Sequence, residues 1–403
     1  MTNFNDLCKN PKRFLSFTGF TLEEFLALLP IFALKFQQYM EQFTIEGKKR
    51  EKRKYVEYKN ACLPLVENKL LFILTYLKGN DLQERIAEMF GISQPKANIW
   101  IHLLNNVLNQ ALEEAEVLPA RDADSLEKNL NKLKEETTER IEIEATEPET
   151  KSIEQIAKVE TVDYETESPE PITEVKTIKT ETKSIEPIAK VETVEYETKS
   201  PEPITEVKTI KTETKTNEPM VGIEDMEIIT MFLHDGTERP INRPIHQAIQ
   251  EIFYSGRKKQ HTLKNILLTD VSGYVHFLSD TCEGKKSDKK IADETGYSLP
   301  IGSYLGQDTG FQGFEIPGVD IVQPKKKPRG GELTKEEKER NCIISRVRVR
   351  VEHAIGGVKR CRIVKDKIRN WKHGFKDKVM ETCCGLHNFR LKFRPWNYEM
   401  AVI

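Results

Sequence analysis

Residues 227–239, EIITMFLHDGTER, decide the fold of the second half of this 403-residue chain. The apolar run 227–233 is rich in isoleucine, which is typical of a buried strand. Further strands are predicted at residues 259–268, 274–278 and 302–307, with a turn at 271–273. A long helix is predicted over residues 333–359, with an apolar stripe of Val347, Val351, Ala354, Ile355 and Val358. Strands that alternate with helices indicate an α/β domain over residues 221–403.

The charge of the chain is strongly segregated. The formal net charge is only -2. Residues 122–219, however, hold 26 Asp and Glu against 14 Lys and Arg, a net of -12. Residues 321–370 hold 16 Lys and Arg against 6 Asp and Glu, a net of +10. A basic block of this size favours a polyanionic partner such as DNA, and a solvated charged face is the alternative.

The cysteines and the apolar runs bear on localisation. Seven cysteines are scattered without a CxxC pair, which predicts neither a disulfide framework nor a zinc site. The N-terminus has no signal-peptide pattern, and the apolar run 25–36 is too short to span a bilayer. We therefore expect a soluble, cytoplasmic protein without membrane contact, associated with the nucleoid if the cell is prokaryotic.

Two further regions precede the α/β domain. Residues 1–121 have a helical pattern, with Thr21 as an expected N-cap, an apolar face (Phe20, Leu22, Phe25, Leu26, Leu28 and Leu29) and a second buried helix over residues 63–77. Residues 122–220 are acidic and contain a 32-residue tandem repeat, at 152–183 and 184–215. The repeat lacks glycine and leucine and is interrupted by prolines, so it predicts a disordered or extended linker, with transient strands as the alternative.

The segment 80–100, NDLQERIAEMFGISQPKANIW, predicts a helix-turn-helix within residues 80–108. Asp81 and Glu84 have the spacing of a capping box, Leu82, Ile86 and Phe90 form the expected inner face, and Gly91 permits the tight turn. The second helix, capped by Ser93, would enter the major groove with its first residues. Candidate DNA contacts there are Gln94, Lys96 and Asn98. An ordinary helical hairpin is the alternative.

Four acidic residues lie where metal chemistry needs them. Asp235 follows the predicted strand 227–233, Asp308 ends the strand 302–307, Asp288 begins a helix, and Glu352 lies inside the long helix. Carboxylate oxygens suit hard divalent cations, and two such ions can activate a water or a 3′-hydroxyl against a phosphodiester. Each acid alone is more often a cap or turn residue, but the combination is specific.

The motifs DGTE, GQDTGFQG and NCIISRVRVRVEHAIGGVKR resemble the catalytic domain of insertion-sequence and Harbinger-like DDE transposases. The resemblance covers about residues 224–395, together with the helix-turn-helix, and not the repeats. It implies a ribonuclease H-like fold, catalytic Asp235, Asp308 and Glu352, and a divalent metal, magnesium or alternatively manganese, bound by these three residues. It also implies Asp288 as a further metal ligand, although GKKSD departs from the family's usual motif.

The implied partner is double-stranded DNA, both the terminal inverted repeats of an element and the target DNA, bound by a homo-oligomer. Basic residues beside the acidic motifs are the expected phosphate contacts in the α/β domain. These are Arg257, Lys258, Lys259, Arg346, Arg348, Arg350 and Lys359.

The sequence therefore predicts a DNA transposase that cuts element ends and transfers the strand. One alternative is a catalytically silent, transposase-derived DNA-binding protein. Another is an interaction protein whose acidic repeats bind a partner.

Overall fold

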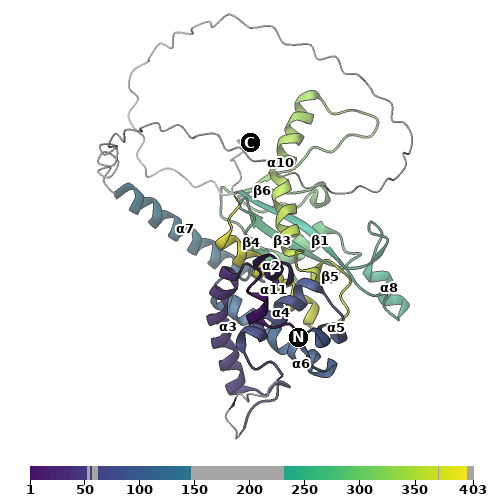
Figure 1. The fold of residues 1–403 in the computed structure, drawn as a ribbon. Coiled ribbons are helices and arrows are strands. Elements are labelled where there is room, and N and C mark those ends of the chain that lie inside the picture. Colours follow the sequence, from purple (N-terminus) through teal and green to yellow (C-terminus); the bar gives the residue numbers. More distant parts are fainter. Residues whose placement is uncertain (52–54, 57–61, 147–230, 371, 397–403) are drawn as a thin grey trace, which may run out of the picture. The chain divides into compact units, whose positions relative to one another are not determined.

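The computed structural model describes residues 1–51, 55–56, 62–146, 231–370 and 372–396. Residues 1–143 and 228–403 form one compact unit, and residues 144–227 are assigned to another. The tandem repeat at 152–215 and the first part of the predicted strand, 227–230, lie outside the described residues. The fold below is that of the first unit (Figure 1).

The N-terminal region is helical, as expected. Its helices are α1 (Phe4–Leu7), α2 (Pro11–Thr18), α3 (Leu22–Gln42), α4 (Val66–Gly79), α5 (Gln83–Phe90) and α6 (Gln94–Glu114). Thr21 caps α3 in a full capping box with Glu24, which confirms the predicted N-cap. Phe25 and Leu28 are buried as predicted, but Leu26 is 47% exposed because it lies on the outer side of α3.

Helix α7 (Ala123–Thr146) occupies the start of the predicted linker. Asp122 accepts a hydrogen bond from the backbone N–H of Ser125 at 2.8 Å, as a cap does. Leu126 and Leu130, one helical turn apart, are buried in the same apolar cluster as the sheet residues Phe232 and Ile266. The folded unit thus continues past residue 121, because this leucine pair has a surface to bury against.

The α/β domain contains one mixed sheet in the order β2-β3-β1-β6-β7, with β4 and β5 also paired to β3. The strands are β1 (Met231–Pro240), β2 (Tyr254–Ser255), β3 (Gln260–Asp270), β4 (Val275–Leu278), β5 (Cys282–Glu283), β6 (Tyr304–Gly306) and β7 (Asp320–Val322). β1 is antiparallel to β3 and parallel to β6, and β6 is parallel to β7. The α/β class is confirmed, and this topology agrees with the ribonuclease H-like fold that the resemblance implies.

Both faces of the sheet are covered by helices. Neighbouring residues of a strand point to opposite faces, and Phe232 and Leu233 accordingly join different clusters. Phe232 packs with Ile291 of α9 (Asp288–Thr295) and with the leucines of α7. Leu233 packs with Val347 and Val351 of α10 (Lys335–Val358). The apolar stripe predicted for this long helix is therefore its buried face.

The last helix, α11 (Phe375–Phe393), connects the α/β domain to the N-terminal helices. Its predicted core face of Val379, Cys383, Leu386 and Phe389 is buried, which confirms that prediction. Asn109 of α6 donates a hydrogen bond to the Glu381 carboxylate at 2.9 Å. All seven cysteines are free thiols.

In the described part of the chain, no single helix is long and apolar enough to cross a membrane. The bent pair α2 and α3 reaches that length and composition only when the two helices are taken together.

Candidate metal centre and nucleic-acid surfaces

Asp235 lies inside β1 and does not follow it, so its predicted position after the strand was wrong. The apolar run ends at Leu233, but β1 continues because β3 pairs with it from Phe232 to Pro240. The parallel partner β6 stops opposite Leu233, at Gly306. Asp235 is therefore the second residue after the point at which β1 loses its parallel neighbour.

Asp308 is the matching residue on the other strand, two positions after Gly306. The parallel register thus places Asp235 and Asp308 at the same level of the sheet. Asp308 ends its strand as predicted, and its carboxylate accepts a hydrogen bond from the backbone N–H of Thr309 at 2.7 Å. It caps the short 3-10 helix Thr309–Phe311, which fixes the carboxylate at the strand end.

His234 and Gln307, the residues before these two aspartates, are hydrogen bonded to each other at 3.0 Å. The imidazole is fully buried and is also stacked on Phe311, with ring centroids 3.9 Å apart. Burial lowers the pKa of His234 to about 3, so the ring is neutral. This pair was not predicted from the sequence. Its signal was a polar residue directly before each aspartate at the end of an apolar run.

Asp288 is the first residue of α9, as predicted, and Ser287 caps that helix. A Cβ atom on Gly236 would lie 2.7 Å from Oδ1 of Asp288, and one on Gly310 would lie 3.6 Å from its Oδ2. The Asp288 carboxylate therefore lies against the residue after Asp235 and beside the turn after Asp308. Gly236 is required because any side chain there would displace Asp288.

The pKa of Asp235 shows that the three carboxylates share one electrostatic environment. This pKa is raised to about 6, first by burial and also by the charges of Asp308 and Asp288, while the N–H of Gly236 and the charge of Arg348 oppose the rise. Negative charge is thus concentrated at a partly desolvated point, which favours a bound cation.

Two basic side chains neutralise part of this charge. The guanidinium of Arg348 lies 3.7 Å from the carboxylate of Asp308. The ammonium of Lys264, on β3, lies 3.2 Å from Asp288 and 3.8 Å from Glu238. Lys264 was not predicted, since a lysine in a strand carries no local signal until the strand pairing places it beside the acids.

Glu352 lies in α10, as predicted, and its side chain is exposed. Arg348, four residues earlier, reaches Asp308, and Lys359, seven residues later, donates to the backbone carbonyl of Glu238 at 3.2 Å. Residues at these spacings share one face of a helix, so Glu352 lies on the face that is directed toward β1. Within the described residues, no ion pair or hydrogen bond fixes the Glu352 carboxylate.

The donors fit a hard divalent cation in chemistry, since all four acids offer oxygen atoms and the glycines leave space beside them. Their oxygens do not converge on one point. Among the described residues, no three acidic, histidine or cysteine side chains are grouped closely enough to hold an ion. The structure thus groups Asp235, Asp288 and Asp308 beside the point of β1 at which β6 stops, with Glu352 on α10 and with Arg348 and Lys264 as counter-charges.

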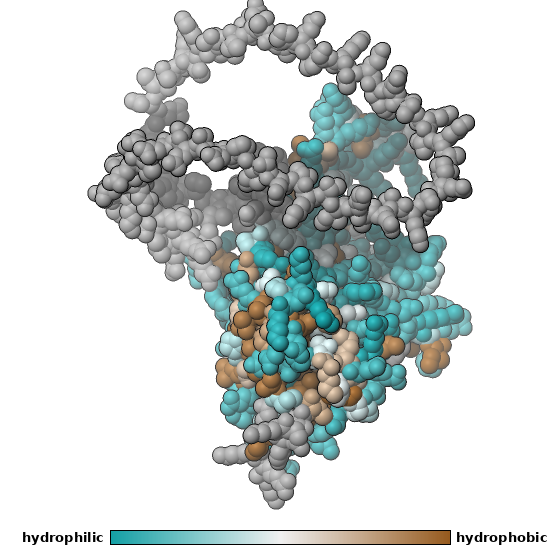
Figure 2. Space-filling view, viewed as in Figure 1, coloured by the Kyte–Doolittle hydropathy of each residue, from teal (hydrophilic) through white to brown (hydrophobic). Residues whose placement is uncertain are grey.

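The predicted DNA-contacting residues of this domain fall into two groups. Arg257, Lys258 and Lys259 form an exposed turn between β2 and β3, and Arg346 is exposed on α10. Lys258 is close enough to Lys359 to contribute, after burial, to lowering the Lys359 pKa to about 8. The turn lies at the Pro240 end of β1, because Lys259 directly precedes β3 and Thr262 of β3 pairs with Pro240. Figure 2 shows mainly hydrophilic residues on this side of the molecule, where Figure 1 places α8 (Gln247–Phe253).

Arg350 and Arg348 correct the prediction that every arginine in RVRVRV faces DNA. Arg350 is only 8% exposed, because it lies close to the buried face of α10. A buried guanidinium is not available to a phosphate in this structure. Arg348 is directed toward Asp308, so its first role is within the site.

The two predicted helices around Gly91 are present, as α5 and α6, and Gly91 adopts the left-handed conformation with φ +66°. Ile86 and Phe90 are buried as predicted. The capping box is not formed, because α5 begins at Gln83 with Leu82 in the cap position. Leu82 is 55% exposed, so it does not belong to the inner face. Ser93 precedes α6 but makes no side-chain cap bond.

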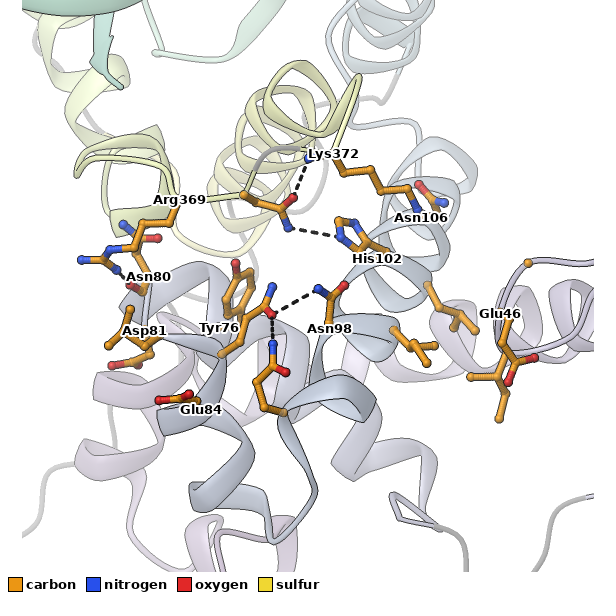
Figure 3. A pocket seen from close by; sticks show the side chains of 18 of the residues that line it. Glu46, Tyr76, Asn80, Asp81, Glu84, Asn98, His102, Asn106, Arg369 and Lys372 are labelled. Atoms are coloured by element: carbon orange, nitrogen blue, oxygen red, sulfur yellow. Dashed lines mark hydrogen bonds between the residues drawn. The ribbon is translucent and has the colours of Figure 1, made fainter. Parts of the chain in front are cut away.

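Two of the three candidate contacts on α6, Gln94 and Asn98, border a cleft of about 820 Å³ (Figure 3). Gln94 and Asn98 both donate to the side-chain oxygen of Gln83, at 2.6 and 3.2 Å. His102 and Asn106 continue this polar stripe at four-residue spacing, a signal that the sequence analysis did not use. Arg369 and Lys372, from the segment before α11, line the same cleft.

Lys96 and His102 differ in their surroundings from the two amides of α6. Lys96 is exposed and lies outside the cleft, with its ammonium 3.1 Å from the Cys62 sulfur. Burial, followed by the charge of Lys372, lowers the pKa of His102 to about 4, so this ring is neutral. The stripe therefore presents amides and a neutral imidazole, which are groups that can read base edges.

Comparison with known families agrees with both modules. Residues 234–388 match the DDE superfamily endonuclease model, and residues 61–114 match the helix-turn-helix of DDE superfamily endonuclease. The chain therefore carries a DDE superfamily endonuclease domain preceded by the helix-turn-helix domain of the same superfamily.

One relative is similar to part of the chain. It is the "Probable transposase for insertion sequence element IS702" of Microchaete diplosiphon, 29% identical over 162 residues. The similarity covers 40% of this chain and 57% of the relative, so little more than half of that protein is matched. No solved structure matches the chain.

Proposed function

We propose that this chain is a DNA transposase, which cuts the ends of an insertion-sequence-like element and joins them to target DNA. The observation that best supports it is the grouping of Asp235, Asp288 and Asp308, from β1, α9 and the end of β6, beside the point at which β6 stops pairing with β1. Both family matches and the insertion-sequence relative favour the same function.

The carboxylates would hold divalent metal, magnesium or manganese, with Glu352 completing the set from α10. When bound, the metal would activate the attacking oxygen and stabilise the leaving oxygen of the phosphodiester. Lys264 and Arg348 keep Asp288 and Asp308 in place beforehand. The neutral His234 holds β1 and the end of β6 together, so Asp235 and Asp308 keep a fixed separation.

DNA contacts are assigned to both modules. Arg257, Lys258, Lys259, Arg346 and Lys359 would bind phosphates beside the carboxylates, where their charge offsets that of the DNA. Gln94, Lys96 and Asn98 would contact the element end, with the amides reading bases. Strand transfer then requires two element ends together, which a homo-oligomer on DNA supplies.

The decisive test is magnesium-dependent cleavage of the DNA that flanks the gene, with purified full-length protein. Asp288→Asn and Asp235→Asn should each abolish cleavage without weakening DNA binding in a metal-free buffer. Asp293→Asn is the matched control, since Asp293 is exposed on the same helix as Asp288 and forms an ion pair with Lys289. Cleavage by Asp235→Asn at the wild-type rate would reject the proposal.

The same assay separates the two alternatives. A catalytically silent DNA-binding protein would bind the flanking DNA and cleave it at no metal concentration. An interaction protein that acts through the acidic repeats would lose its function when residues 152–215 are deleted. The transposase proposed here should retain cleavage after that deletion, because the repeat lies apart from every site residue in the sequence.

A further inference from the structure

Residues 242–253, which follow β1, form an arm that bears three isoleucines. The chain continues from Pro240 through Ile245 into α8, no residue of which is buried. Ile245 is 93% exposed, and Ile249 and Ile252 on α8 are 39% and 43% exposed. Single exposed apolar residues are ordinary, but here three isoleucines within eight residues are exposed. Figure 2 shows brown surface where Figure 1 places α8.

The tip of the arm is held in a fixed conformation. The side-chain amide of Gln250 donates to the backbone carbonyls of Pro244, at 2.8 Å, and Ile245, at 3.2 Å. The guanidinium of Arg243 donates to the oxygen of the same amide at 2.9 Å. Pro244 restricts the backbone directly before the isoleucine. Ile245 therefore projects into solvent from a turn that these hydrogen bonds hold in one conformation. Less conformational entropy is then lost when the Ile245 side chain inserts into a partner.

The charges around the patch indicate the chemistry of that partner. Arg243, Arg257, Lys258 and Lys259 are exposed on the arm and the following turn, and Glu251 is the single acidic residue between residues 243 and 259. This gives a net charge of +3 over the segment. DNA complements this combination, because it offers phosphates beside apolar base faces.

The arm is also in reach of DNA held at the carboxylates. Lys359 donates to the carbonyl of Glu238, which lies between Asp235 and Pro240 on β1, and the basic turn 257–259 leads into β3 beside Pro240. β1 rises about 3.3 Å per residue, so Pro240 is roughly 17 Å along the strand from Asp235. This distance corresponds to about five base pairs at roughly 3.4 Å each.

We propose that Ile245 is a wedge that inserts between two stacked base pairs, about five or more base pairs from the scissile phosphate, while the surrounding Arg and Lys side chains hold the backbone. Apolar wedges flanked by basic residues unstack and kink DNA in this manner. The inference rests on the proposed DNA cleavage function, since it assigns to that DNA a distortion site on this chain.

The test uses the full chain and a 40-base-pair duplex that contains several TA steps, in a buffer with chelator. In a series of such duplexes, the adenine of one TA step at a time is replaced by 2-aminopurine. TA steps unstack readily, and 2-aminopurine fluorescence rises when its stacking is lost. Wild-type protein should raise the fluorescence several-fold at one or two adjacent positions. Ile245→Ala should abolish that rise at saturating protein. Ile301→Ala, a control at an isoleucine that is 88% exposed elsewhere in the domain, should retain it.

A second readout is the preference for DNA that is already unstacked. Wild-type protein should bind a duplex with a mismatch at that position roughly tenfold more tightly than the paired duplex, because the cost of unstacking is removed. Ile245→Ala should bind the two duplexes equally. Both measurements are free of metal, so Asp235→Asn should behave as wild type, and loss of cleavage is distinguished from loss of the wedge.

Two outcomes would overturn the wedge. One is a wild-type protein that raises no 2-aminopurine signal, or an Ile245→Ala variant with an undiminished signal. The other is a change in oligomeric state of Ile245→Ala in sedimentation without any effect on the fluorescence, which would assign the patch to contacts between copies.

Discussion

The imidazole Nε2 of His234 lies 3.0 Å from the side-chain oxygen of Gln307. The amide nitrogen of Gln307 donates to the carbonyl of Phe314, so its oxygen accepts from His234. The other ring nitrogen then accepts from the hydroxyl of Tyr297 at 2.5 Å. A neutral histidine thus connects the residue before Asp235 to the residue before Asp308, and this connection sets the spacing of the two carboxylates.

Removing the Gln307 amide should weaken both the fold and the site. Gln307→Leu leaves the N–H of His234 and the carbonyl of Phe314 buried without these partners. Each such group costs about 1–3 kcal/mol, so we expect the free energy of unfolding to fall by roughly 2 kcal/mol or more. Urea denaturation followed by circular dichroism measures this change.

Gln312→Leu is the control for Gln307→Leu, since Gln312 is exposed nearby and its replacement should alter the unfolding free energy by less than about 0.5 kcal/mol. Equal stabilities of the two variants would show that the His234–Gln307 bond is not structurally important. Magnesium-dependent cleavage by Gln307→Leu, measured where the variant is fully folded, should also be slower because Asp308 is no longer held.

The raised pKa of Asp235 predicts a pH-dependent stability in the absence of metal. Its folded pKa of about 6 lies above the unfolded value, so the stabilising contribution is complete below about pH 4 and is lost as pH rises through 6. Wild-type protein in chelator should therefore lose up to about 3 kcal/mol relative to Asp235→Asn between pH 4 and pH 8. Urea denaturation at the two pH values measures the difference.

A second experiment measures the effect of added magnesium on thermal stability. At pH 8 the ion should raise the melting temperature of the wild type, because it compensates the concentrated carboxylate charge. Asp235→Asn should show a smaller rise. A stability difference between wild type and Asp235→Asn that is the same at pH 4 and pH 8 would contradict the buried, crowded environment of this carboxylate.

The local sequence pattern was sufficient to place Asp288, Asp308 and Glu352 on the correct kind of element. It failed for Asp235 because the length of β1 is set by its pairing with β3, which a reading of hydrophobicity along one strand does not contain. Lys264 and Gln307 were missed for the same reason. Their roles exist only once strands that are distant in sequence are adjacent.

The composition after residue 122 does not indicate the structure of that segment. The segment that follows is acidic, and its charge suggested a linker. Leu126 and Leu130 are nevertheless buried, because a single helical turn that presents two leucines to an apolar sheet gains more from burial than the surrounding charges lose. In the same manner, Arg350 was predicted from its basic neighbours to bind DNA, although its helical position places it in the interior.

Arg346 and Arg350 should respond differently to replacement by alanine. Arg346 is exposed, so Arg346→Ala should weaken binding of any duplex and reduce the slope of log K against log salt concentration by about 1, with little change in stability. Arg350→Ala should instead lower the free energy of unfolding by about 1–3 kcal/mol, since its buried stem and hydrogen-bonding groups are removed.

Fluorescence anisotropy at several salt concentrations and urea denaturation, applied to both arginine variants, separate the two effects. A reduced salt slope for Arg350→Ala with unchanged stability would show that Arg350 reaches DNA in a conformation different from the one described. An unchanged slope for Arg346→Ala would remove Arg346 from the DNA surface.

Asn98 offers the most direct test of base reading by α6. Its amide faces the cleft of Figure 3 and is already oriented by Gln83, so a base could replace that partner. If it contacts a base edge, Asn98→Ala should reduce the preference for the element end over a scrambled duplex by about 1–3 kcal/mol, while nonspecific affinity stays nearly constant. Competition binding with both duplexes measures the preference, and Gln110→Ala, at an exposed position near the other end of α6, is the matched control. If Asn98→Ala and Gln110→Ala retained the same preference as the wild type, Asn98 would be a structural residue of the α5–α6 turn, and sequence recognition would have to be sought on another part of α6.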